Sequence, residues 1–360
     1  MSKARPFIFL FVLLALVWPA AFYFHRLNAS DDNAFREVVS SDAFRMGLRL
    51  KSPDGCVALA SMDRLNLVIV GNSHVFDGID VHELAEAYPG KSVGVCALGH
   101  WNTDAFAPFL GYLDDQGLAP ERVIWVADLG TLGVVPTSAE FQTYYEALFS
   151  EPSVRAETQD VWTENIENGR PALGVSETDY ANGLAQMHEA LADVDPQNVE
   201  AIVRAHDLHD EIATRQLLKQ LELNPRNDRN LRQLCAGITQ RSITLDIVVY
   251  PLLPTTIELG DAGTADTELA MDIGGYLTET MECARRVVDA PLAEWQLDAR
   301  HFINRWDTPG YDYGLWNDAE SFAARYDALS GPDRARLFDT DHLNPVGAKI
   351  FTRELVRRLD

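Results

Sequence analysis

The first residues in this chain that suggest chemistry are a glycine and a serine that directly follow a short apolar run. Residues 67–70 read Leu-Val-Ile-Val, a continuously apolar and mostly β-branched stretch typical of a buried strand in a parallel sheet. Gly71 has no Cβ and permits a sharp turn, and Ser73 follows two residues later. Open α/β sheets bind ligands just beyond the carboxyl ends of their strands. The pattern therefore predicts Ser73 at such an edge, although a plain turn has the same local signature.

A second group of polar residues lies near the other end of the chain. Asp339 precedes His342 by three residues in a loop before an expected amphipathic helix at 346–359. A serine nucleophile, a histidine base and an aspartate that fixes the imidazole tautomer form a hydrolase triad, which is recognised by these roles rather than by their order. We assign the roles to Ser73, His342 and Asp339, with Asp341 as the alternative acid.

Both segments resemble sequence blocks of the SGNH (GDSL-like) hydrolases. Residues 71–74, Gly-Asn-Ser-His, resemble the nucleophile block of that family. Residues 339–342, Asp-Thr-Asp-His, resemble its closing Asp-x-x-His block, and the Leu-Asn-Pro-x-Gly-Ala that follows is also similar. The resemblance covers about residues 65–128 and 243–360. His74 is expected to point away from the cleft if Ser73 faces it, and to pack or to support the site from behind.

The resemblance implies an oxyanion hole made by the backbone N–H of Ser73, a glycine of a second block and an asparagine of a third. Donors aimed at the developing oxyanion are worth several kcal/mol in such sites. Gly99, just past the second expected strand, matches the glycine by position. No third block is visible, because the third strand runs into Asp128, which cannot donate a hydrogen bond when ionised. We take Asn102 as the substitute donor.

Strand-like and helix-like segments alternate around these residues. Strands are expected at 67–70, 92–98, 122–127 and 243–250, and helices at 80–88, 103–116, 268–289 and 346–359. Alternation at βαβ spacing predicts an α/β fold with a doubly wound parallel sheet. The resemblance implies a flavodoxin-like three-layer sandwich.

The chain divides into three expected regions, of which the largest is an SGNH-like α/β domain at 65–360. A lead-in segment at 26–64 precedes it, behind an N-terminal anchor at 1–25. Between the third and fourth strands, residues 136–240 carry amphipathic helices and no buried strand. This stretch is too long for a structureless loop in a compact domain, so we interpret it as a helical insertion.

The N-terminus predicts a membrane anchor. Lys3 and Arg5 precede residues 6–24, which carry no charged side chain, and about 20 apolar residues suffice to cross a bilayer. The alternative is a cleaved signal peptide, for which no clean small-x-small cleavage site is present. We therefore expect a single-pass protein of a bacterial inner membrane, with the main domain on the periplasmic or extracellular side.

Composition excludes some partners. The net charge of −24 and the isoelectric point of about 4.6 argue against binding to nucleic acid. The four cysteines permit disulfides in an exported domain but show no zinc-binding spacing, and Cys96 reads as a small buried apolar residue. His206 and His209 lie one helical turn apart without an identifiable third ligand, so we expect no metal and no cofactor.

Together these features predict a membrane-anchored serine esterase or O-acyltransferase that acts on O-acetyl or other acyl esters. The resemblance implies a cell-surface polysaccharide as substrate and a multispanning membrane acyltransferase as partner. The alternative is a catalytically inactive SGNH fold that serves as a binding or assembly component of an envelope polysaccharide complex.

Overall fold

The computed structural model describes most of the α/β domain. The described residues are Cys56, Leu59, Met62, 64–98, 101–134, 146–151, short stretches between 184 and 201, 222–223, 225–253, 272–302 and 342–360. Among these residues no helix is long and apolar enough to cross a membrane. The expected anchor at 1–25 lies outside the described residues.

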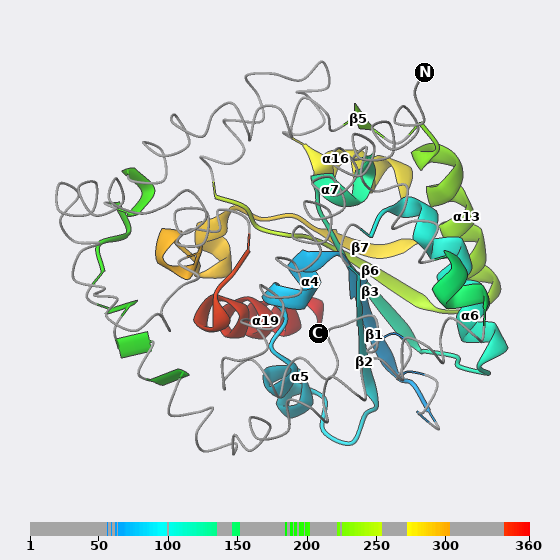
Figure 1. Ribbon diagram of the computed structural model, residues 1–360, viewed down its shortest axis with the longest axis horizontal. Coiled ribbons are helices and arrows are strands. Elements are labelled where there is room, and N and C mark those ends of the chain that lie inside the picture. The colour runs from blue at the N-terminus through cyan, green and yellow to red at the C-terminus, as the bar shows by residue number, and fades with distance from the viewer. Residues whose placement is uncertain are drawn as a thin grey trace, which may run out of the picture.

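A five-stranded parallel sheet forms the centre of the domain (Figure 1). Its strands are β1 (Leu67–Gly71), β2 (Val93–Ala97), β3 (Arg122–Ala127), β6 (Thr244–Val249) and β7 (Ala284–Val288). Their order in space is β2-β1-β3-β6-β7, with every neighbouring pair parallel. The order is that of a doubly wound sheet, in which the chain runs outward from β1 to β2 and then crosses back to β3. The α/β fold predicted from the sequence is confirmed.

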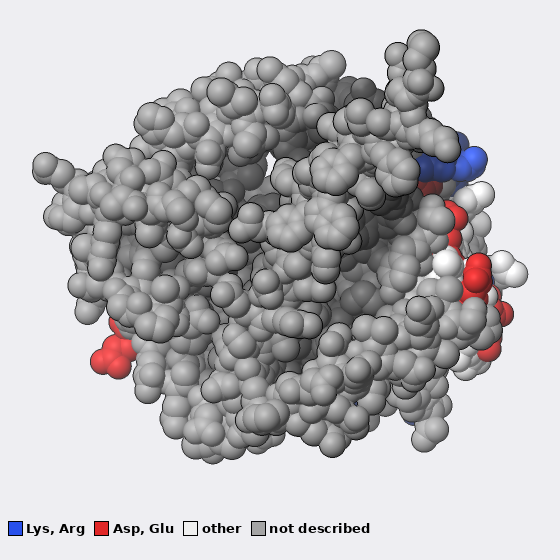
Figure 2. All heavy atoms as spheres, viewed as in Figure 1, with Lys and Arg blue, Asp and Glu red and all other residues white. Residues whose placement is uncertain are grey.

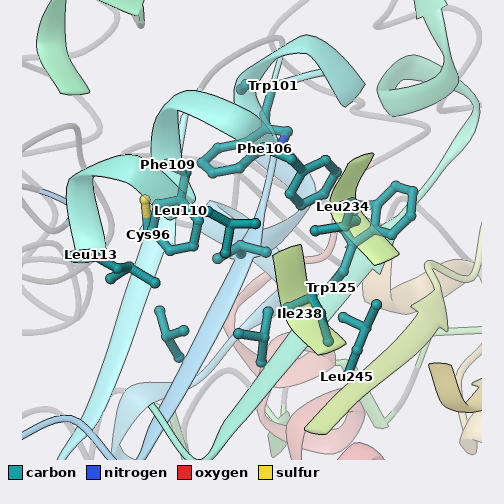
Figure 3. Packing of buried hydrophobic residues seen from close by; sticks show 14 of the residues in the cluster. Cys96, Trp101, Phe106, Phe109, Leu110, Leu113, Trp125, Leu234, Ile238 and Leu245 are labelled. Carbon is teal, nitrogen blue, oxygen red and sulfur yellow. The ribbon is translucent and has the colours of Figure 1, made fainter. Parts of the chain in front are cut away.

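Helices cover both faces of this sheet, so alternate side chains of the strands serve two separate cores. One face carries α4 (Ser73–Gly78), α5 (Val81–Ala87) and α19 (Pro345–Leu359), and the other carries α6 (Phe106–Asp115), α13 (Asn227–Gln240) and α16 (Ile273–Thr280). Leu67 and Ile69 of β1 pack on the first face, and Val68 and Val70 on the second. In the second core the aromatic side chains of Trp101, Phe106 and Phe109 cluster over the sheet (Figure 3).

The fifth strand corrects one prediction. A continuous helix was expected at 268–289, whereas the chain forms α16 and then β7, which pairs with β6. Arg285 and Arg286 of β7 lie beside Asp246, a carboxylate of β6 that is completely buried. A buried carboxylate is tolerated only when it is paired, and Arg285 and Arg286 supply that pairing together with Arg122 of β3, on the other side of β6.

The same arginines hold the end of α19. Arg122 and Arg285 donate hydrogen bonds to the carbonyl of Leu359 at 3.0 and 3.1 Å, and Arg286 donates to the carbonyl of Arg358 at 2.6 Å. These carbonyls have no partner within the helix, and cations near them also interact favourably with its dipole. The sheet therefore fixes α19 at the end that is remote from His342.

A small antiparallel pair joins β4 (Gly133–Val134), just before the expected insertion at 136–240, to β5 (Glu222–Leu223) within it. The pair brings the two ends of the intervening segment together beside the main sheet. The last helix of the expected range, α13, packs against α6 and crosses from β3 back to β6. In a space-filling view, acidic and a few basic side chains lie along the edge where α6 and α13 are found (Figure 2).

Two disulfides connect the four cysteines. Cys56 pairs with Cys96 and ties the lead-in segment to β2. Cys235 pairs with Cys283 and ties α13 to the start of β7. Cys96 is buried, as expected, but it does not pack as a free apolar residue, because it forms a disulfide with Cys56, 40 residues away in the sequence. Such cross-links stabilise mainly by restricting the unfolded chain.

Candidate active site

Ser73 is presented by a sharp turn between β1 and α4. A Cβ on Gly71 would lie 2.5 Å from Val75 Cγ2 and 2.7 Å from the carbonyl oxygen of Val126, so only glycine fits there. Asn72 caps α4, and its side-chain oxygen accepts a hydrogen bond from the backbone N–H of His74 at 3.0 Å. The turn places Ser73 at the carboxyl edge of the sheet, as the sequence predicts.

His342 comes to the same edge from the loop before α19. Asn344 caps that helix by accepting from the N–H of Gly347 at 2.9 Å, and its amide donates to the carbonyl of Arg300 at 2.9 Å. The N–H of Leu343 donates to the Tyr250 hydroxyl at 3.0 Å. The residues on the C-terminal side of His342 are therefore held at several points.

These two loops bring Ser73 and His342 into contact. The Ser73 Oγ lies 2.8 Å from His342 Nε2, although the residues are 269 positions apart in the sequence. This is hydrogen-bond distance for a nucleophile and its general base. When the serine hydroxyl donates, Nε2 is the unprotonated ring nitrogen, and the ring proton then lies on Nδ1. Both side chains are only partly buried.

An unexpected carboxylate lies beside this pair. Asp77 sits on α4, one helical turn after Ser73, and its Oδ2 is 3.8 Å from His342 Nε2. At this distance it forms an ion pair with His342 whenever the imidazole is protonated. The spacing of four residues from Ser73 could have revealed it, because residues at i and i+4 share one face of a helix.

The remaining predicted site residues are placed as follows. Asp339, its alternative Asp341 and the expected oxyanion donor Gly99 lie outside the described residues. Asn102 is buried in the loop after β2, where its side-chain oxygen accepts from the N–H of Asp104 at 2.9 Å and caps the 3₁₀ helix η2 (Thr103–Ala105). That bond leaves the amide nitrogen of Asn102, its only side-chain donor, for other partners.

His74 turns away from Ser73 and contacts a buried carboxylate that the sequence did not assign to any role. Its Nδ1 forms a short contact with Asp128 Oδ2, just past the end of β3. The His74 ring stacks on Tyr250 with centroids 4.3 Å apart and planes inclined by 16°. Its other neighbour is the His342 ring, at a centroid distance of 4.8 Å. His74 therefore lies directly behind the Ser73–His342 pair.

Asp128 is held in its charged form by its neighbours. Burial raises the pKa of this carboxyl group, but the adjacent His74 and the hydrogen bonds from His74, Thr131 and Asn72 outweigh it, so the pKa lies below its usual value. Asn72 Nδ2 donates to Oδ2 at 2.6 Å, and the N–H of Thr131 donates to Oδ1 at 2.8 Å. An ionised Asp128 with these partners cannot act as an oxyanion donor.

The site lies where a doubly wound sheet places its ligands. The chain leaves β1 toward β2 and returns to the other side of β1 at β3, so the direction of winding changes between β1 and β3. Ser73 follows β1 and Asp128 follows β3. Crevices form at this switch point because adjacent connections leave the sheet on opposite faces. Among the described residues, no group of three or more His, Cys, Asp or Glu could hold a metal ion.

Fold and site together define an α/β protein with a hydrogen-bonded serine–histidine pair at the switch point of a parallel sheet. Comparison of the sequence with protein-family models finds no match, and comparison with curated proteins finds none either.

Proposed function

We propose that this protein is an SGNH-like serine esterase or O-acyltransferase. The observation that carries the proposal is the 2.8 Å contact between Ser73 Oγ and His342 Nε2. Hydrophobic packing alone gives no reason to align a hydroxyl and an imidazole in this way at the carboxyl edge of a sheet. The switch-point position adds support, since an acyl group needs an accessible crevice.

The reaction has two steps. Ser73 Oγ attacks the acyl carbonyl carbon while His342 Nε2 takes the serine proton, and the ester C–O bond then breaks as His342 returns that proton to the leaving alcohol. In the second step a water molecule or an acceptor hydroxyl gives its proton to His342 and attacks the acyl-enzyme, which releases the acid or the new ester and restores Ser73. Water as the acceptor makes the protein an esterase, and a sugar hydroxyl makes it an acyltransferase.

The other proposed roles follow the resemblance to the family. Asp339 orients the imidazole, with Asp341 as the alternative acid. The backbone N–H of Ser73, Gly99 and the amide of Asn102 stabilise the oxyanion. Residues 65–360 form the SGNH-like domain, with a helical insertion at 136–240.

We further propose that the domain lies outside the cytoplasm behind the anchor at residues 1–25, in a bacterial inner membrane. The two disulfides support this location, because they persist in oxidising compartments and are rare in the cytosol. An O-acetylated cell-surface polysaccharide is the proposed substrate. A multispanning membrane acyltransferase is the proposed partner, since an acyl donor made inside the cell must be passed across the membrane.

A pocket between α5 and α19 supports a polymeric or otherwise sizeable ligand. It has a volume of about 740 Å³ and lies between α5, α19 and residues 184–188 of the expected insertion. Its wall combines apolar Val346 and Ile350 with polar His82, His188 and Lys349. Ligand pockets in proteins commonly have volumes of about 300–1,000 Å³.

A fluorophosphonate probe tests the proposal. Ser73 Oγ would attack phosphorus and displace fluoride while His342 takes the proton, so an activated serine becomes labelled and an idle one does not. We expect labelling of the purified protein, its loss in Ser73→Ala, and peptide mapping of the label to residue 73. A folded parent protein that takes up no label would overturn the proposal.

One observation favours a second candidate, an inactive SGNH fold that binds or assembles an envelope polysaccharide complex. The end of β3 carries the buried carboxylate Asp128 in place of an amide donor. This candidate predicts no labelling together with retained binding of an acetylated polysaccharide.

A further inference from the structure

We propose that Asp128 and His74 are positioning residues for the His342 base, which they reach through Tyr250 and through the ring contact of His74 with His342. This inference rests on the proposed function, because it gives a role to residues behind the Ser73–His342 pair. Asp128 and His74 form a carboxylate–imidazole pair. This pair is separate from Asp339, the acid proposed to orient His342 directly.

A continuous series of contacts carries the inference. Asp128 binds His74 Nδ1, the His74 ring stacks on Tyr250, and the Tyr250 hydroxyl accepts from the N–H of Leu343. Leu343 is the residue next to His342 in the chain. The His74 ring also lies against the His342 ring itself, at 4.8 Å between centroids. Two routes, one through the backbone and one through the rings, therefore connect Asp128 to the base.

Each member of this series is held firmly. Asp128, His74 and Tyr250 are 1%, 7% and 2% exposed. The bond to Asp128 sets the angle of the His74 ring, which therefore cannot rotate without losing a charge-assisted contact in a buried site. Tyr250 also packs edge-on against Phe351 of α19, with centroids 5.5 Å apart, and so connects the stack to the helix that follows His342.

The arrangement also brings a fixed negative charge behind the base. The described groups that face His342 are Ser73, His74 and Asp77 of α4, with Tyr250 next to His74. Asp128 lies one ring further away, in contact with His74. A carboxylate near an imidazole favours the imidazolium that forms during attack. Removing the charge of Asp128 therefore shifts a pH midpoint to lower pH, namely the midpoint of any reaction that needs His342 in its neutral form.

Asp128→Asn tests the inference, with the second-order rate constant of fluorophosphonate labelling measured against pH in the full-length protein. Asparagine keeps the size of the side chain and removes its charge. We expect the plateau rate to fall roughly ten-fold or more, since small displacements of catalytic groups have large effects. We also expect the midpoint to shift to lower pH.

Tyr250→Phe provides the coupling test, because phenylalanine keeps the stacked ring and removes the bond to Leu343. If Asp128 acts through Tyr250, the double variant is little slower than the slower single variant. Should Asp128→Asn fail to fold, His74→Gln replaces it, since glutamine retains a donor for Asp128 but lacks the stacking ring.

Asp246→Asn is the matched control. Asp246 is a buried carboxylate in the same sheet, but it pairs with arginines at the opposite end of the strands. The Asp246→Asn substitution is expected to lower the free energy of unfolding and to leave the pH midpoint of labelling unchanged. An Asp128→Asn protein with the parental rate or with an unmoved midpoint overturns the inference, and an effect that simply multiplies that of Tyr250→Phe overturns the route through Tyr250. An unlabelled parent protein instead removes the proposed function.

Discussion

Asp77 Oδ2 lies 3.8 Å from His342 Nε2, the same ring nitrogen that faces the Ser73 hydroxyl. The base is therefore approached by a nucleophile and by a carboxylate from a single short helix, α4. The carboxylate is well placed to stabilise the imidazolium once the serine proton has been transferred.

Replacing Asp77 with asparagine should slow Ser73 labelling a few-fold and move its pH midpoint downward. The effect is modest because both side chains are partly exposed, and such pairs are worth up to about 1 kcal/mol. Labelling rates across the pH range, at low and high salt, measure it. Asp115→Asn, on an exposed position of α6 over the other face of the sheet, serves as the control. An upward or absent shift would show that Asp77 does not act on the base.

Ser73→Ala and His342→Ala should each abolish turnover of an activated acetyl ester, because nucleophile and base act as a unit. Asp339→Asn should be strongly impaired but retain more activity, and Asp341→Asn should have the smaller effect of the two. The melting temperatures of Ser73→Ala and His342→Ala should change by only a few degrees, since loss of these partly exposed side chains changes stability by about 1 kcal/mol or less. A larger loss of activity in Asp341→Asn than in Asp339→Asn would identify Asp341 as the acid that orients His342.

His188→Ala should weaken action on an acetylated polysaccharide and spare hydrolysis of a small acetyl ester. His188 lies in the pocket wall contributed by the expected insertion, and neither Ser73 nor His342 lines this pocket. Comparing kcat/KM for the two substrates measures the difference. Arg229→Ala, on an exposed part of α13, is the matched control. Equal losses on both substrates would exclude a role for this pocket in substrate selection.

Acid should destabilise the protein partly through Asp128. A carboxyl group whose pKa is lower in the folded chain contributes stability above its ordinary pKa of about 4, and that contribution is lost as the pH falls through the folded value. The stability difference between the parent protein and Asp128→Asn should therefore be largest near neutrality and should narrow in acid. Denaturant unfolding from about pH 7 to about pH 3 measures it. A difference that stays constant would mean that the charge of Asp128 is not stabilising.

The local pattern of apolar and polar residues in the sequence is enough to predict most of the strands and the last helix. Four parallel strands are predicted because each is a short apolar run bounded by turn residues, and the helix at 346–359 because its apolar residues recur at helical spacing. Ser73 and His342 are identified from the same kind of local pattern. Ser73 follows a predicted strand, and His342 lies in the loop before the last predicted helix. These features depend on neighbours within a few positions, which the sequence displays.

Only the tertiary structure decided the relationships between distant segments. β7 was missed because Arg285 and Arg286 read as helix surface until Asp246 of the neighbouring strand supplies their partner. The disulfide partners and the contacts from Asp128 to His74 and Tyr250 likewise depend on which strands become neighbours. Contacts of this kind arise because the strand order β2-β1-β3-β6-β7 places β3 beside β1, and that order comes from burying two faces of one sheet at once.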